Sequence, residues 1–158
     1  MTHADVLLLW RIAVAALLSF VLGFERELRG APAGDRTYSL VGTASAAVTA
    51  VTIRSSPQAV AGVITGIGFV GGALVFRGEQ GVLRGVTSAA TIFAVAAIGV
   101  VAGAGHLVSA ALVAALVLFD LELRHLPGLR LLDASRYTGR MAVDYPPVDA
   151  ATEADGGD

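Results

Sequence analysis

The residues best suited to take part in chemistry are charged side chains that follow a long apolar run. They are Glu25, Arg26, Glu27 and Arg29. If the apolar run is a helix that continues through them, Glu25 and Arg29 are i,i+4 partners in the favourable order, with the acid N-terminal to the base. The pattern indicates a helix end at which both signs of charge meet.

Two interpretations of this segment remain open. In one, the charges are a solvated helix end that fixes the orientation of the chain in a membrane. In the other, Glu25, Arg26 and Arg36 form a buried functional cluster at the inner mouth of a helix bundle, and Thr37 caps the next helix. The second is testable, because removing one partner of a desolvated pair costs about 3–5 kcal/mol, whereas an exposed pair is worth about 1 or less.

Catalytic and metal-binding patterns are weak elsewhere. Arg11 lies within an apolar run, where a charge is a functional candidate by default, although snorkelling to the surface is an alternative. His106 stands alone in an expected turn. The chain has no cysteine and neither the Gly-x-Ser-x-Gly nor the His-Glu-x-x-His pattern. We therefore expect no enzyme and no cofactor.

A glycine pattern, Gly66 to Gly71, matches the G-x-G-x-x-G fingerprint of dinucleotide sites. That site needs a preceding strand and an acid about 20 residues on, where this chain has Thr91. Close helix packing in a membrane is the better interpretation, because small residues let two backbones approach. The glycines spaced for such contacts, within one chain or between two, are Gly62, Gly66, Gly68, Gly72, Gly99 and Gly103.

The elements that would position these residues are transmembrane helices. Hydrophobic residues make up 55% of the chain and charged ones 15%, against about 25% charged in soluble domains. The net charge of −2 implies no attraction to nucleic acid. We predict an all-α, polytopic bundle of about five spans. These are Val6–Gly23, Tyr38–Ile53, Ala59–Phe76, Val86–Val101 and Leu107–Leu123.

Arginine placement predicts the orientation. With the N-terminus outside and the C-terminus inside, nine of the ten arginines outside the spans fall on the inner side. The glycine-containing segment from Gly103 to His106 would turn the chain between the last two spans. We expect residues 1–125 to form the transmembrane domain and residues 126–158 to be a largely disordered cytoplasmic tail.

Three stretches resemble the MgtC/SapB family of prokaryotic membrane proteins. They are Gly23–Gly42 (GFERELRGAPAGDRTYSLVG), Gly66–Arg77 (GIGFVGGALVFR) and Arg84–Gly105 (RGVTSAATIFAVAAIGVVAGAG). Asp35, Tyr38 and Phe93 depart from the residues common in that family. The resemblance implies a multi-pass protein of the cell membrane, here a short form without the cytoplasmic regulatory domain of longer members.

The resemblance also implies a role in magnesium homeostasis or low-magnesium stress. Some members are thought to act on other membrane machines, such as the F-type ATP synthase or cation transporters. Besides lipid, we therefore expect such proteins, or a second copy of the chain, as partners. The alternative is a transporter or channel for Mg²⁺ or another cation. Against it, the mid-span polar residues are mainly hydroxyls, which make a weak cation site: Ser45, Thr49, Thr65, Thr87, Ser88 and Thr91.

Overall fold

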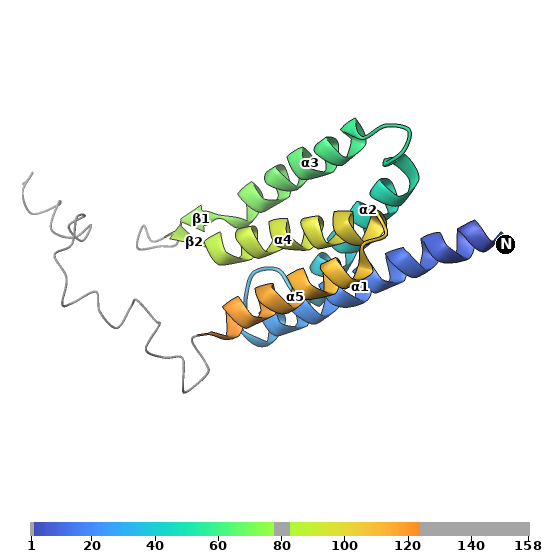
Figure 1. Ribbon diagram of the computed structural model, residues 1–158. Coiled ribbons are helices and arrows are strands. Elements are labelled where there is room, and N and C mark those ends of the chain that lie inside the picture. The colour runs from blue at the N-terminus through green and yellow to red at the C-terminus, as the bar shows by residue number, and fades with distance from the viewer. Residues whose placement is uncertain (1, 78–82, 124–158) are drawn as a thin grey trace, which may run out of the picture. The chain divides into compact units, whose positions relative to one another are not determined.

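The computed structural model describes residues 2–77 and 83–123, which form five helices and one short strand pair (Figure 1). The helices are α1 (His3–Leu28), α2 (Asp35–Thr52), α3 (Gln58–Leu74), α4 (Val86–Gly103) and α5 (Leu107–Glu122). Strands β1 (Phe76–Arg77) and β2 (Leu83–Arg84) pair antiparallel between α3 and α4. The all-helical expectation is confirmed, and each helix overlaps one predicted apolar run.

Helix α1 is longer than the apolar run that predicted it. It begins with a capping box, in which the Thr2 hydroxyl accepts from the Asp5 amide at 3.2 Å and the Thr2 amide donates to the Asp5 carboxylate at 2.7 Å. It continues through the charged segment and ends before Gly30, whose φ of 68° is left-handed. Its 26 residues measure about 39 Å, so α1 both crosses the bundle and presents Glu25 at one end.

Helix α2 packs between α1 and α4, and these three helices form the core. One stripe of α2 is buried, and its members are small or polar: Tyr38, Gly42, Ser45, Ala46 and Thr49. Gly42 lies so close to α1 that a Cβ there would overlap the Ser19 hydroxyl. At Gly99 of α4, a Cβ would lie 2.6 Å from the Gly42 carbonyl oxygen. Close backbone contact through small residues therefore holds this core together.

Helices α3 and α5 lie outside that core. Helix α3 packs mainly on α4 and buries only Ile67 and Gly71. Helix α5 buries Ala110 and Ala114 among its described residues. Large apolar side chains of α5 stay exposed: Val108, Leu112, Leu116 and Phe119.

The six packing glycines fall into two groups. Gly99 and Gly103 contact α2, because a Cβ at Gly103 would lie 2.5 Å from the Ala46 carbonyl oxygen. For the other four, which are all on α3, no described residue outside the adjoining part of that helix lies within 4 Å of such a Cβ: Gly62, Gly66, Gly68 and Gly72. Helix α3 thus uses none of these four for close contact within the chain, and a contact with another chain stays a prediction.

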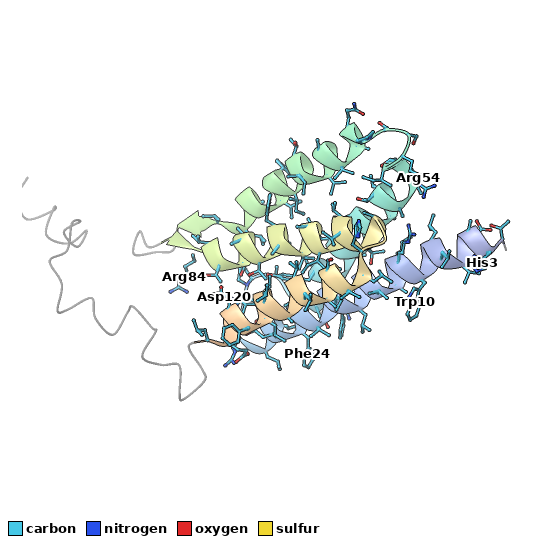
Figure 2. The ribbon with its side chains drawn as sticks, viewed as in Figure 1. His3, Trp10, Phe24, Arg54, Arg84 and Asp120 are labelled. Carbon is cyan, nitrogen blue, oxygen red and sulfur yellow. The ribbon has the colours of Figure 1, made fainter. Side chains whose placement is uncertain are left out.

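The two ends of the bundle carry different residues. Phe24 and Arg84 lie at one end, and His3 and Arg54 at the other (Figure 2). The turn between α4 and α5 falls in the predicted segment, at Gly105 with a φ of 100°. Among the described residues, two helices, α1 and α4, are long and apolar enough to cross a membrane, and α3 is a shorter apolar helix.

By internal contacts the chain divides into Met1–Phe119 and Asp120–Asp158. The predicted tail, residues 126–158, lies outside the described residues.

Candidate functional site

The charged cluster consists of Glu25, Arg26 and Arg29 at the C-terminal end of α1. Glu25 Oε1 accepts from Arg29 Nε at 3.2 Å, and Glu25 Oε2 lies 3.7 Å from Arg26 Nη1. The side chains of Glu25 and Arg26 are only 9% and 15% exposed, whereas that of Arg29 is 38% exposed. One carboxylate thus faces two guanidinium groups, which leaves the cluster with one net positive charge.

Gly23 lies where α2 packs most closely on the C-terminal part of α1. A Cβ on Gly23 would lie 2.7 Å from both the Asp35 Cα and the Tyr38 Cβ. The first turn of α2 therefore packs directly on α1 at this glycine. The side chain of Glu25, two residues further along the helix, is 9% exposed, and the two arginines supply the compensating charge that a buried carboxylate needs.

Tyr38 links the charged cluster to α4. It is fully buried, and its hydroxyl donates to the Ser88 carbonyl at 3.3 Å. The hydroxyl also interacts with Thr91 and with the charges of Arg26 and Glu25. Sequence reasoning noted Tyr38 only as a departure from the family pattern. The available signal was a tyrosine in an apolar helix, since a buried phenol hydroxyl needs a partner.

Arg36 and Thr37 lie apart from the cluster. Arg36 is exposed, and no ion pair joins it to Glu25. It lines an open polar depression of about 350 Å³ together with Glu27, Gly34, Asp35 and Thr37. Of the proposed group, the structure brings Glu25 and Arg26 together but leaves Arg36 at the surface.

The N-terminus of α2 is capped differently from expectation. Its N-cap is Gly34, so Thr37 is already inside the first turn and does not cap the helix. Glu27 of α1 takes this role, because its Oε2 accepts from the Asp35 amide at 3.2 Å. A carboxylate suits the positive end of the helix dipole. A Cβ at position 34 would meet the end of the flexible Glu27 side chain, which would have to move its carboxylate to make room.

Arg11, in the N-terminal half of α1, completes the C-terminus of α4. Three of the last four carbonyls of α4 accept hydrogen bonds from backbone amides of the following turn. The Val100, Val101 and Ala102 carbonyls accept from the amides of residues 104, 106 and 105, respectively. The fourth, that of Gly103, accepts from Arg11 Nη1 at 3.5 Å. The Arg11 guanidinium therefore has a structural partner at the C-terminal, negative end of a helix dipole, where a positive charge is favoured.

Between these two ends the core carries a polar seam on α1, α2 and α4. Its fully or nearly fully buried members are Ser19, Tyr38, Ser45, Thr49, Ser88 and Thr91. All are neutral hydroxyl side chains. Among the described residues, no group of three or more histidine, cysteine, aspartate or glutamate side chains could hold a metal ion.

Comparison with known proteins gives consistent matches over most of the chain. The model of the MgtC family matches residues 12–126. Protein MgtC of Brucella abortus is 38% identical over 127 residues, covering 77% of this chain and 52% of that protein. Protein SapB of Bacillus subtilis is 29% identical over 116 residues, covering 65% and 50%.

A further relative is the Escherichia coli protein named "Putative magnesium transporter YhiD", which is 32% identical over 136 residues, covering 78% of this chain and 63% of that protein. The chain thus spans about half to two thirds of the length of these relatives. No solved structure matches. The family model covers well over half of the chain, including the charged cluster and the polar seam, and the chain therefore belongs to the MgtC family.

Proposed function

We propose that this protein is a non-enzymatic, multi-pass protein of the cell membrane that regulates magnesium homeostasis by acting on other membrane proteins. Its five helices would each cross the bilayer, with the N-terminus outside. Family membership and the magnesium in one relative's name support the physiological theme. We infer action on partner proteins, rather than transport of magnesium, from the charges of the core.

The observation that carries the proposal is the sign of those charges. The polar seam has only hydroxyl side chains, and its ends hold Arg11 and the net-positive charged cluster. At an effective dielectric constant of 20, two unit charges 4 Å apart interact by about 4 kcal/mol, so a divalent cation beside an arginine is repelled by about 8. A magnesium path would instead need oxygen ligands with negative charge near the ion.

The surface of α3 supports contact with a partner. Its exposed face is built from glycines and other small residues, among which Phe69 projects with 84% of its surface exposed. The exposed faces of α1 and α5 carry large side chains such as Leu17 and Leu112. In a bilayer, small residues favour helix–helix contact, whereas large apolar side chains suit lipid. The partners we propose are cation transporters, the F-type ATP synthase or a second copy of the chain.

Transport of Mg²⁺ is the second candidate, because one relative is named as a magnesium transporter. Cells that depend on this protein for growth at low magnesium separate the two. If the protein acts on a partner, expression restores growth, whereas in cells that also lack their magnesium transporters the initial rate of magnesium uptake stays that of cells without this protein. A rate of uptake that rises in proportion to the amount of protein would contradict the proposal.

A further inference from the structure

Four buried side-chain atoms of the described residues have no hydrogen-bond partner, and all lie on α1 or α2. They are Ser19 Oγ, Glu25 Oε2, Arg26 Nε and Thr49 Oγ1. Glu25 and Arg26 at least compensate each other's charge. Ser19 and Thr49 have no such compensation, although both residues are completely buried. Buried polar groups in proteins are nearly always paired with protein or with water, so these two hydroxyls need an explanation.

Other hydroxyls in the chain show the usual solution within a helix, which is donation to the carbonyl four residues earlier. Four threonines do this at distances of 2.7 to 2.9 Å: Thr43, Thr52, Thr65 and Thr91. Thr49 lies on the same helix as Thr43 and Thr52 and does not. The unpaired state of Thr49 is therefore not a general property of threonine in these helices.

The surroundings of both hydroxyls are small residues and backbone. The Ser19 hydroxyl lies against Gly42, close to which the Ala15 carbonyl oxygen also lies. A Cβ at Gly103 would lie 3.0 Å from the Thr49 Cβ and 2.5 Å from the Ala46 carbonyl oxygen. Glycine leaves carbonyl oxygens such as those of Ala15 and Ala46 uncovered by side chains in the two regions where these hydroxyl residues lie. A buried water needs two to four polar partners of this kind.

We propose that buried water binds in the α1–α2–α4 core at Ser19 and at Thr49. The ligand is a neutral molecule that both donates and accepts hydrogen bonds, as a hydroxyl and a carbonyl together require. A cation does not fit, because Arg11 lies at one end of the polar seam and a cluster with net positive charge at the other. The inference concerns hydration alone and does not rest on the proposed function.

The test measures magnetisation transfer from water to individual residues, by solid-state NMR of the full chain in lipid bilayers. Ala96, fully buried on α4, is the dry reference, and Ser55, exposed between α2 and α3, is the wet one. We expect transfer to Ser19 and Thr49 several-fold faster than to Ala96 and close to that of Ser55. Transfer to both hydroxyl residues as slow as to Ala96 overturns the proposal.

A second measurement uses Thr49→Val, which keeps the shape and removes the hydroxyl. If the hydroxyl holds water, the variant loses hydrogen bonds and its midpoint of thermal unfolding in detergent falls below that of the wild type. If the hydroxyl is dry, the variant removes an unsatisfied polar group, and its midpoint is equal or higher. The second result contradicts the proposal at Thr49. The NMR measurement on the wild type decides if the variant does not fold.

Discussion

Replacing Glu25 by Gln removes the only negative charge of the charged cluster and leaves its two guanidinium groups together. Arg26 is 15% exposed and loses the carboxylate oxygen 3.7 Å away, while Arg29 is 38% exposed and can turn toward solvent. Breaking a buried ion pair by removing one partner costs about 3–5 kcal/mol. Because only Arg26 is left both buried and unpaired, we expect a loss near 3 kcal/mol, at the lower end of that range.

Glu27→Gln is the matched control. It makes the same change of charge two residues along α1, on a side chain that is exposed. Glutamine keeps an oxygen that can accept from the Asp35 amide, so the cap of α2 remains. We expect this variant to unfold within about 1 kcal/mol of the wild type, because exposed charges contribute little.

The assay is thermal unfolding of the purified proteins in detergent, together with growth of dependent cells at low magnesium. Membrane amounts are matched first by immunoblot. We predict that Glu25→Gln unfolds at a clearly lower temperature than Glu27→Gln and fails to support growth. Equal unfolding temperatures and equal growth of the two variants would refute the argument, since Glu25 would then be a solvated anchor.

The remaining predictions concern packing, the tyrosine link and orientation. Gly99→Leu should abolish the peak of folded protein on a sizing column, because even a Cβ would lie 2.6 Å from the Gly42 carbonyl oxygen. Gly68→Leu should keep the fold and change only an oligomer or a complex with a partner. Loss of fold in both would show that α3 packs differently. Tyr38→Phe should lower the free energy of unfolding by about 1 kcal/mol through the lost bond to the Ser88 carbonyl, and no change would mean that the bond is weak. Because the chain lacks cysteine, a single engineered cysteine can be labelled selectively. Gln58→Cys should react with an impermeant thiol reagent in intact cells, whereas Gln80→Cys, which is not among the described residues, should react only after permeabilisation. The reverse pattern would mean that the orientation is inverted.

The helices could be predicted from sequence because long apolar runs separated by charge or glycine leave few alternatives. Their bounds were less certain where polar residues continue a helix, as in α1, which extends to Leu28. The i,i+4 pair of Glu25 and Arg29 was also predictable, because it depends only on the helical repeat, and the structure confirms it at 3.2 Å.

Features that depend on tertiary contact could not be read from spacing. The cap of α2 comes from Glu27 on another helix, so the local pattern around Thr37 pointed to the wrong residue. Glycines four apart occur on α3 and on α4 alike, yet only those of α4 meet α2, because which face turns inward is decided by the rest of the bundle. The burial of Glu25 likewise depends on the packing of other segments around the end of α1 and not on the local sequence pattern.

The central claim is that a core bounded by Arg11 and a net-positive cluster does not conduct magnesium. The most direct test is Mg²⁺ entry into liposomes that contain the purified wild-type protein and an enclosed magnesium-sensitive dye, with an imposed potential, inside negative, to drive cations inward. Liposomes with an established magnesium channel show that the assay responds. We predict entry no faster than into protein-free liposomes at every magnesium concentration. Entry that scales with the amount of protein and saturates with magnesium would contradict this account.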